Sequence, residues 1–293
     1  MKKIRLLFLS LFMLTMVNCK KDSNESGEDA NQSKPVPVTV TSTSSSPRPA
    51  STLASLLSFE KFIQASKSSQ STLTQNYTYD GRSITKVTST SGSDIQVENF
   101  YYKDMSKGLL DSIVKTFNGQ FAGKVTYESA NNKITAIRYY DDTNAMYFQM
   151  TFSNYNSNGY PANVGYLYIT DNGNVDLAGT ITYANGNVQT VDLSGQYSGY
   201  NLTMTEQYTY DNKKQEYLNV ETQLSPLIAK NNITRSEINL EVAGTSLSQS
   251  ISTYTYTYND NDYPISSQAT ISSTQNGTST TGNLSQEIVY EDK

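Results

Sequence analysis

The side chains that most often carry out catalysis are scarce in this sequence of 293 residues. It contains no histidine and a single cysteine, Cys19. Without histidine, a Ser-His-Asp triad, a Cys-His dyad and a His-ligated zinc or iron site are all excluded. We therefore expect no enzymatic activity and no cofactor. The residues left for function are the cysteine itself, the carboxylates and the tyrosines.

Cys19 ends a segment that is typical of protein export. Basic residues within positions 2–5 precede the apolar run from Leu6 to Val17, which is too short to span a bilayer as a helix. The run leads into Asn18-Cys19 and resembles a bacterial lipobox, in which fatty acids such as palmitate are attached to the cysteine. Two or three acyl chains anchor a protein firmly, whereas one does not. The sequence predicts a signal peptide over residues 1–18 and a membrane anchor through lipidated Cys19.

The charge of the chain limits its partners and its location. Removal of residues 1–18 takes away three basic residues and changes the formal charge from −5 to −8. Such a protein has no electrostatic attraction for nucleic acid. Lys20 stands where inner-membrane lipoproteins carry an aspartate, and the charged residues after it resemble the export tract of Bacteroidetes-type surface lipoproteins. We expect an outer-membrane, lipid-anchored protein at the cell surface, with the periplasmic face as the alternative.

Several carboxylates are candidates for metal binding or hydrolysis. Asp171 and Asp176 enclose an Asn-Gly-Asn sequence that offers oxygen ligands to calcium, although a turn explains the same residues. A glycoside hydrolase needs two carboxyl groups about 5–10 Å apart. The residues available for such a pair are Asp141, Asp142, Asp260 and Asp262, and the sequence does not bring any two of them together. A carboxylate-based polysaccharide hydrolase is therefore the alternative function.

The tyrosines, 23 in number against no tryptophan, are the most abundant candidates for ligand contact. Tyrosine faces stack on sugars and peptide side chains while the hydroxyl remains in water. Tyr254, Tyr256 and Tyr258 share one face of a predicted strand and are candidate ligand-facing aromatics. For most tyrosines we expect a structural role, because the residue suits a half-buried pleated surface.

A modification site is suggested by the tripeptide Asp111-Ser112-Ile113. It resembles the Asp-Ser/Thr-aliphatic site of Bacteroidetes-type protein O-glycosylation. The resemblance implies that Ser112 carries a glycan.

The elements that hold these residues begin after a polar N-terminal region. Residues 19–50 contain four of the seven prolines and many Ser, Thr and Asn residues, which predicts a lipidated cysteine followed by a disordered tether. Residues 51–74 are predicted to form one short helix and a connection, since the apolar residues between Leu53 and Ile63 fall on one stripe.

From Gln75 onward the chain repeats a hairpin pattern. An aromatic-x-aromatic strand end is followed by a polar turn and a β-branched strand, first at Tyr77–Val87 and last at Tyr254–Pro264. The repeats predict seven or eight hairpins in an all-β, antiparallel up-and-down meander over residues 75–293. A twisted sheet of this size tends to curl, so we expect a barrel-like or closed sheet.

These motifs carry a resemblance to known proteins. The turn Tyr77-Thr78-Tyr79-Asp80-Gly81-Arg82 resembles the YD-type repeat. The stretch Leu224–Thr234 followed by Tyr254–Pro264 is similar to a Bacteroidetes outer-membrane lipoprotein family of unknown function with a porin-like β-fold. The resemblance implies a β-protein of the cell envelope and transfers no catalytic residue.

The strand pattern argues against insertion of this barrel in the bilayer. A lipid-facing strand needs an aliphatic outer face, whereas Thr253, Thr255 and Thr257 form one face of the last repeat and three tyrosines form the other. The sequence therefore predicts a water-exposed barrel tethered by Cys19. Its expected function is a non-catalytic binding or structural module whose partner is a glycan or an envelope protein.

Overall fold

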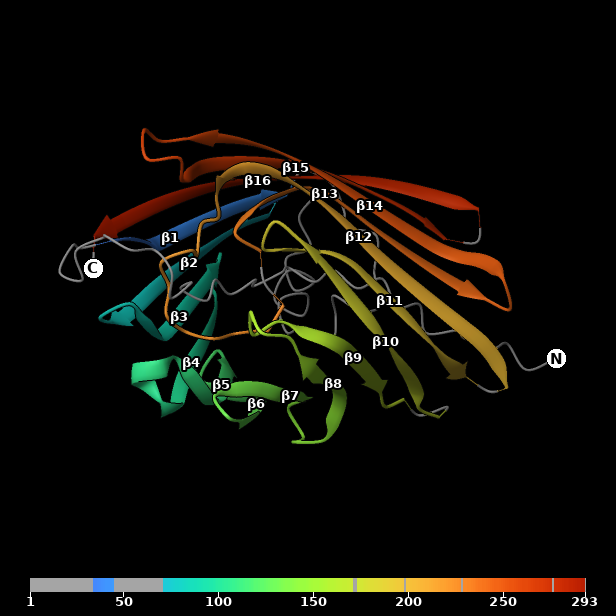
Figure 1. Cartoon of the computed structure of the whole chain (residues 1–293). Coiled ribbons are helices and arrows are strands. Elements are labelled where there is room, and N and C mark those ends of the chain that lie inside the picture. The colour runs from blue at the N-terminus through green and yellow to red at the C-terminus, as the bar shows by residue number, and fades with distance from the viewer. Residues whose placement is uncertain are drawn as a thin grey trace.

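In a computed structural model, the described residues form sixteen antiparallel strands (Figure 1). The structure describes residues 34–44, 71–170, 173–197, 199–227, 229–275 and 277–292. Cys19 and the helix predicted within residues 51–74 lie outside these ranges. The described helical element is one 3-10 turn, η1 (Met105–Lys107), and no helix among the described residues is long and apolar enough to cross a membrane.

The strands are numbered in chain order. The first eight are β1 (Pro35–Ser44), β2 (Ser71–Asp80), β3 (Ser83–Ser91), β4 (Asp94–Asp104), β5 (Leu109–Phe117), β6 (Gln120–Ala130), β7 (Lys133–Tyr140) and β8 (Met146–Tyr155). The second eight are β9 (Pro161–Tyr168), β10 (Val175–Ala184), β11 (Asn187–Tyr197), β12 (Tyr200–Lys214), β13 (Asn231–Val242), β14 (Thr245–Tyr258), β15 (Pro264–Gln275) and β16 (Thr278–Asp292).

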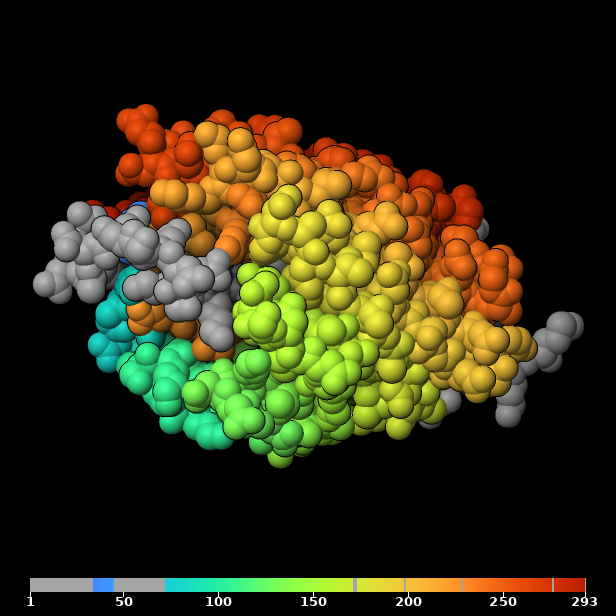
Figure 2. Space-filling view, viewed as in Figure 1, coloured from blue at the N-terminus to red at the C-terminus, as the bar shows by residue number. Residues whose placement is uncertain are grey.

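Every strand pairs with its neighbours in sequence, and the first strand closes the sheet into a barrel. Val40 of β1 lies opposite Ile288 of β16 on one side and opposite Gln75 of β2 on the other. In Figure 2 the wall is continuous and passes from green through yellow to orange, as consecutive strands lie side by side. The predicted antiparallel meander is confirmed, and the sheet is closed.

The first strand corrects one sequence-based prediction. Pro35–Ser44 falls within the range predicted as a disordered tether, yet it forms β1. Its two prolines suggested disorder, but Val36 and Val40 are buried, and beyond the register shift at Pro37–Thr39 the buried residues Val40 and Ser42 alternate with half-buried Thr39 and Thr41. This alternation gives a half-buried strand, and the backbone of β1 bonds to a partner on both edges. Pairing and burial therefore outweigh a composition that is typical of disorder.

Turn chemistry sets the strand ends. Four two-residue loops have positive φ at both positions, as a type I′ hairpin requires: 118–119, 131–132, 185–186 and 243–244. Two longer turns share one geometry, in which the side chain of Asn156 or Asn259 accepts the N–H groups two and four residues later at 3.0 Å. Each is followed by a tyrosine and by the proline that begins β9 or β15, a position where a strand tolerates proline.

The two faces of the barrel wall differ in polarity. In β10, Val175, Leu177 and Ile181 are buried, whereas Asp176 and Thr180 between them are exposed. In most other strands apolar and tyrosine side chains face the inside, and Thr, Ser, Asn, Gln and charged residues cover the outside. The inner side also holds buried serines, namely Ser42, Ser89, Ser250, Ser252 and Ser267. Outer hydroxyls pair across strands, for example Thr182 with Thr190 at 2.7 Å. The interior of this barrel is therefore its hydrophobic core.

Candidate functional site

One opening of the barrel collects most of the tyrosines. Because consecutive strands are antiparallel, the even-numbered strands all end at the same opening, which we call the tyrosine mouth. Tyrosines on the inner or rim side of this end are Tyr77, Tyr79, Tyr102, Tyr127, Tyr155, Tyr160, Tyr183, Tyr208, Tyr210, Tyr256, Tyr258, Tyr263 and Tyr290. The repeated Tyr-x-Tyr motif of the sequence thus forms a ring of aromatic side chains.

Many of these tyrosines brace neighbouring strands through the hydroxyl group. Five hydroxyls donate to a backbone carbonyl of the preceding strand: Tyr79 to Pro37, Tyr102 to Ile84, Tyr155 to Ile134, Tyr256 to Ile233 and Tyr290 to Pro264. Each acceptor stands just before the extra residue of a β-bulge. A bulge interrupts the strand ladder and leaves backbone groups to be satisfied from elsewhere. These hydroxyls therefore support the bent rim of the barrel.

A long connection between β12 and β13, residues 215–230, crosses the tyrosine mouth; we call it the crossing segment. It leaves β12 and reaches β3 and the η1–β5 junction, which lie seven or eight strands away around the sixteen-stranded wall. Figures 1 and 2 show this orange segment beside the cyan and teal strands of the opposite wall. Because it spans the opening, the segment narrows this end of the barrel.

The crossing segment is fixed to the opposite wall by backbone and side-chain bonds. The hydroxyl of Thr222 accepts the N–H of Ile84 at 2.7 Å and lies 2.6 Å from the hydroxyl of Tyr102. Glu221 forms an ion pair with Arg82, and its N–H donates to the Arg82 carbonyl at 3.0 Å.

The η1–β5 junction provides a second attachment for the segment. The N–H of Gln223 donates to the Gly108 carbonyl at 2.8 Å. Gly108 has φ of 64°, and a Cβ at this position would overlap the Glu221 carbonyl. Glycine is therefore required where the segment passes closest to the wall.

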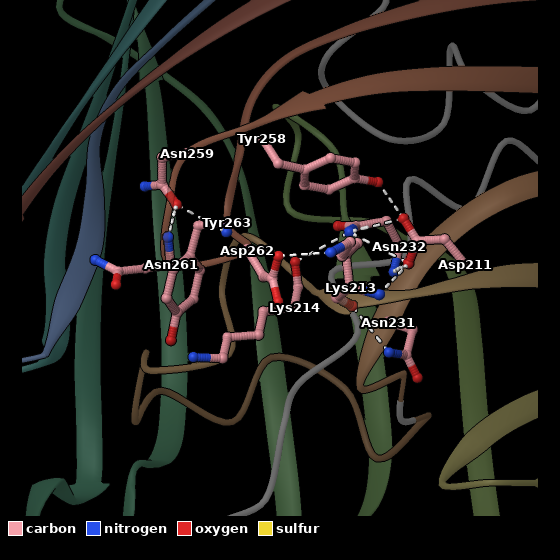
Figure 3. A network of polar contacts seen from close by, with 10 residues as sticks. All are labelled: Asp211, Lys213, Lys214, Asn231, Asn232, Tyr258, Asn259, Asn261, Asp262 and Tyr263. Atoms are coloured by element: carbon pink, nitrogen blue, oxygen red, sulfur yellow. Dashed lines mark hydrogen bonds and ion pairs between the residues drawn. The ribbon is translucent and has the colours of Figure 1, made fainter.

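A polar network fixes the base of the crossing segment between β12 and β13 (Figure 3). The Asp211 carboxylate accepts the N–H of Lys213 at 2.9 Å, the N–H of Asn232 at 3.1 Å and the hydroxyl of Tyr258. Lys213 also pairs with Asp262 of the β14–β15 turn at 2.6 Å. Because the polar groups in this network have partners, we interpret it as a structural clamp.

Glu216 brings a carboxylate into the tyrosine mouth. It lies in the crossing segment next to Tyr217, whose hydroxyl is 2.8 Å from that of Tyr77. Burial raises the pKa of Glu216 to about 7, and the hydrogen bond from Tyr217 opposes this shift. No lysine or arginine of the described part of the chain pairs with this half-buried side chain. The mouth therefore contains an acidic group for which the described residues supply no counter-ion.

A second acidic group lies deeper, on the inner face of β12. Glu206 is fully buried between Val191 and Ile238 of the adjacent strands. The Tyr208 hydroxyl donates to one of its oxygens at 2.6 Å, and the other oxygen has no hydrogen-bond partner among the described residues. Burial raises the pKa of Glu206 to about 7.

The interior also contains one ion pair of its own. Lys115 and Glu98 are 3.1 Å apart, and each side chain is 13% exposed. Gln96 donates to the same Glu98 carboxylate at 3.1 Å. With this pair neutral, Glu206 and Glu216 give the described interior an acidic character.

The three tyrosines singled out from the sequence lie on the inner side of β14. Tyr254, Tyr256 and Tyr258 are half-buried, whereas the threonines between them are exposed, so the predicted division into two faces is confirmed. The ring centroids of Tyr254 and Tyr256 are 6.4 Å apart in a stacked arrangement, and those of Tyr256 and Tyr258 are 6.0 Å apart. Their contact with a ligand remains a prediction.

The other candidates from the sequence are scattered. Asp176 is exposed on the outer face of β10, and Asp171 lies outside the described residues. Ser112 is half-exposed on β5, and its hydroxyl donates to the Asp111 carboxylate at 3.2 Å. Among the described residues, no group of three or more His, Cys, Asp or Glu side chains is arranged to hold a metal ion. Calcium binding and O-glycosylation at these positions remain predictions.

The acidic residues considered for glycoside hydrolysis do not come together as a pair across a cleft. Asp141 and Asp142 are in the β7–β8 turn, at the barrel opening opposite the tyrosine mouth. Asp260 and Asp262 are in the β14–β15 turn, and Asp262 is paired with Lys213. The length of the strands separates the two turns by roughly 20 Å or more. A carboxylate of one turn and a carboxylate of the other are therefore farther apart than the pair of a glycosidase.

The architecture is shared with a solved bacterial barrel. It is similar to a porin-like protein from Bacteroides uniformis. That crystal structure matches with a TM-score of 0.51 over 87% of this chain and 96% of its own length, at 16% sequence identity. A porin-like protein from Bacteroides vulgatus matches 88% of this chain and 99% of its own, at 13% identity and a TM-score of 0.47. No family model and no curated protein sequence matches the chain.

Sequence reasoning missed the two acidic groups and the segment that carries one of them. Glu206 interrupts the inner apolar pattern Leu202-x-Met204-x-Glu206-x-Tyr208, and this interruption was the available signal. Nothing comparable marks Glu216, because a connection has no alternation that could place its side chains inside or outside. The B. uniformis match establishes the porin-like fold, and the role of the mouth follows only from this chain's own residues.

Proposed function

We propose that this protein is a lipid-anchored, non-catalytic binding module of the outer membrane, and that it takes its ligand at the tyrosine mouth. The observation that carries the proposal is the polarity of the wall. Apolar and aromatic side chains face inward, and hydroxyl, amide and charged side chains face outward. A barrel in the bilayer needs the opposite arrangement, with an apolar band outside.

The interior also favours binding over conduction. Residues such as Tyr166, Leu177 and Met204 are fully buried inside the wall, and the crossing segment occupies the tyrosine mouth. A porin instead keeps a polar, water-filled interior. Half-buried tyrosines, together with a carboxylate that pairs with no described lysine or arginine, are the groups in this mouth best suited to hold a ligand.

The anchor and the water-exposed barrel are tested together by the variant Cys19→Ala. The wild-type protein should incorporate labelled palmitate and remain with outer membranes during alkaline carbonate extraction. The variant should lose the label and be released as a folded protein, because nothing on the outer wall holds it in lipid. Retention of Cys19→Ala in the extracted membranes would show that the barrel itself is embedded.

The orientation at the membrane is tested in intact cells. External protease should digest the wild-type barrel if it lies at the cell surface, and should reach it only after the outer membrane is opened if it faces the periplasm. A periplasmic control protein must stay intact in the same sample. The proposal of cell-surface exposure fails if barrel and control become accessible together.

A further inference from the structure

One sector of the outer wall departs from its polar pattern. The outward-facing residues of β4 are Ile95, Val97, Asn99 and Tyr101, which we call the β4 stripe. Ile95 is 45% exposed and Tyr101 is 51% exposed. Phe121 of β6, 42% exposed, extends the stripe, because Thr116 of β5 lies opposite both Val97 and Phe121. Apolar side chains thus gather on three neighbouring strands.

The other exposed large apolar residues of the described barrel do not gather in this way. Ile169 and Tyr200 stand next to turns, and Ile265 and Val289 are single positions on β15 and β16. Single exposed apolar residues are normal on a protein surface, whereas a group of them marks a contact surface. The β4 stripe is therefore the part of the described outer wall that indicates a partner.

Three lysines flank the stripe. On β3, Lys86 lies opposite Asn99. On the other side, Val114 of β5 lies opposite both Asn99 and Lys124 of β6, so the two lysines stand in one row across four strands. Lys103 is exposed near the end of β4. Basic groups therefore surround the apolar stripe.

The contacts of these lysines leave their charge uncompensated. Nζ of Lys124 is 4.8 Å from the centroid of the Tyr140 ring, and Nζ of Lys103 is 3.5 Å from the Ser129 hydroxyl. No described carboxylate forms an ion pair with Lys86, Lys103 or Lys124. Their charges remain available to an anionic partner.

The charge of the chain differs between the two sides of the barrel. Residues 83–140, which form β3 to β7, include seven basic and five acidic residues. Residues 175–292, which form β10 to β16, include four basic and thirteen acidic residues. Strands β11 to β13 lie across the ring from β4. An anionic surface therefore attracts the wall at β4 and repels the opposite wall.

The position of the first strand places the stripe near the predicted lipid anchor. Cys19 precedes Pro35, the start of β1, by sixteen positions, which a chain spans by at most roughly 55 Å. Around the wall, β4 is the third strand from β1, and neighbouring strands are about 5 Å apart. An anchor at Cys19 therefore keeps the β4 stripe within reach of the bilayer.

We infer that the β4 stripe and its three lysines form a surface that lies on the headgroups of anionic lipid and so orients the barrel on the membrane. This inference rests on the lipid anchor of the proposed function. Apolar and tyrosine side chains suit the headgroup layer, and lysines meet the lipid phosphates. A protein partner usually takes roughly 20–30 residues on each side, more than the stripe offers. The contact supplements the anchor, which holds the stripe at high local concentration near lipid.

Tryptophan fluorescence tests the orientation, because the chain contains no tryptophan of its own. Phe121→Trp places the reporter beside the stripe, and Thr203→Trp places it at an exposed position of β12 on the opposite wall. The lipidated full-length variants are reconstituted in vesicles of phosphatidylglycerol and acyl-brominated phosphatidylcholine, in which bromine quenches tryptophan on contact. We expect quenching and a blue shift for Phe121→Trp and neither change for Thr203→Trp.

Two triple variants of equal net charge test the lysines. One carries Lys86→Gln, Lys103→Gln and Lys124→Gln, and the other carries Thr180→Glu, Ser194→Glu and Thr203→Glu at exposed outer positions of β10 to β12. Both are made in the full-length Cys19→Ala chain, and binding to vesicles of phosphatidylcholine and phosphatidylglycerol is measured by co-sedimentation. The lysine variant should bind at least about tenfold more weakly, a difference of about 1.4 kcal/mol, and the control should bind like its parent. Thermal unfolding establishes that both are folded.

The outcomes separate this inference from the proposed function. Equal loss of binding in the two triple variants, or no quenching of Phe121→Trp, would overturn the lipid contact and leave the anchor in place. Quenching of both reporters would mean that the whole wall is in lipid, which contradicts the proposed function as well. A glycan found on Ser112 of the native protein would also overturn the contact, because Ser112 lies opposite Tyr101 and a sugar there would hold the stripe away from the headgroups.

Discussion

Glu206 stands at a position where the alternation of β12 calls for an apolar side chain. Its neighbours on the inner face, Met204 and Tyr208, are buried, and Val191 and Ile238 lie opposite it on the adjacent strands. An ionised carboxylate is strongly disfavoured in such surroundings, so the neutral acid is stabilised instead. Burial accordingly raises the pKa of Glu206 to about 7, while the hydrogen bond from Tyr208 favours the charged form.

This residue makes the stability of the barrel depend on pH. The native state binds the proton more tightly than the unfolded chain, whose glutamate pKa is about 4.3. The stabilising contribution of protonated Glu206 is therefore complete below about pH 4 and is lost as pH rises through about 7. The whole loss amounts to about 4 kcal/mol, from 1.36 kcal/mol per unit of pKa, and about 3 kcal/mol of it falls between pH 5 and pH 8.

The variant Glu206→Gln tests this contribution. Gln keeps the shape of the neutral acid and does not titrate. Between pH 5 and pH 8 the free energy of unfolding of the wild type should therefore fall by about 3 kcal/mol more than that of the variant. Urea unfolding at the two pH values measures the difference. Glu216 titrates in the same range, and it cancels in the comparison because both proteins carry it.

The control for this measurement is a glutamate on the outer face. Glu287→Gln, at an exposed position of β16, should show the same change between pH 5 and pH 8 as the wild type. If Glu206→Gln also follows the wild type, the carboxylate is ionised at both pH values and its burial has no energetic consequence.

At the scale of the strand, the tyrosine motif is explained by the bulges beside it. Tyr256 of β14 donates to the carbonyl of Ile233 at 2.8 Å, where β13 carries an extra residue. Tyr210 occupies the corresponding end of β12, and its hydroxyl is buried with no hydrogen-bond partner among the described residues. The same residue type thus has opposite energetic roles at neighbouring positions.

The substitutions Tyr256→Phe and Tyr210→Phe form a matched pair. Loss of the Tyr256 hydroxyl leaves a carbonyl without its donor and should lower the free energy of unfolding by about 1–2 kcal/mol. Loss of the unpartnered Tyr210 hydroxyl should leave stability unchanged or raise it, because a buried polar group is removed. Urea unfolding at constant pH distinguishes the two. Equal effects of the two substitutions would mean that the hydrogen bond from Tyr256 to Ile233 does not stabilise the barrel.

The sequence predicted hairpins well because their turns depend on a few local residues. Asn259 with Tyr263-Pro264, and the Asn-Gly pair at 185–186, specify backbone conformations that few other residues allow. The crossing segment was not predicted, since Thr222 and Gln223 bond to Ile84 and Gly108, more than a hundred residues away. Contacts between distant parts of the chain leave no periodic pattern in the sequence.

The candidate site illustrates the same limit. The common face of Tyr254, Tyr256 and Tyr258 follows from the two-residue period of a strand. That this face points into a closed barrel follows only from the pairing of β1 with β16, which a stretch of Pro, Val, Thr and Ser does not reveal. Glu216 becomes part of the mouth only because the crossing segment turns inward.

At the scale of the whole molecule, the fold shared with a porin-like protein and the polarity of the wall point to different settings. Sixteen antiparallel strands can enclose a channel in a membrane or a packed interior in water, and the choice depends on which face is apolar. Here Leu177 and Met204 are fully buried inside the barrel, while Thr180 and Thr205 lie on the outer side. Strand topology alone therefore does not assign this barrel to the bilayer.

Closure by β1 is the feature on which the whole barrel depends. Without this strand, β2 and β16 would each expose a row of unpaired backbone groups, which promotes aggregation. The core would also lose Val36 and Val40, both at most 2% exposed, and a fully buried valine contributes about 1.5–3 kcal/mol.

A chain that begins at residue 45 should be less stable than the wild type by at least about 3 kcal/mol and should aggregate. A chain that begins at Lys34 keeps β1, so it should keep the elution volume and the urea midpoint of the longer protein. Size-exclusion chromatography and urea unfolding of the two chains test closure directly, and equal behaviour would show that the barrel does not need its first strand.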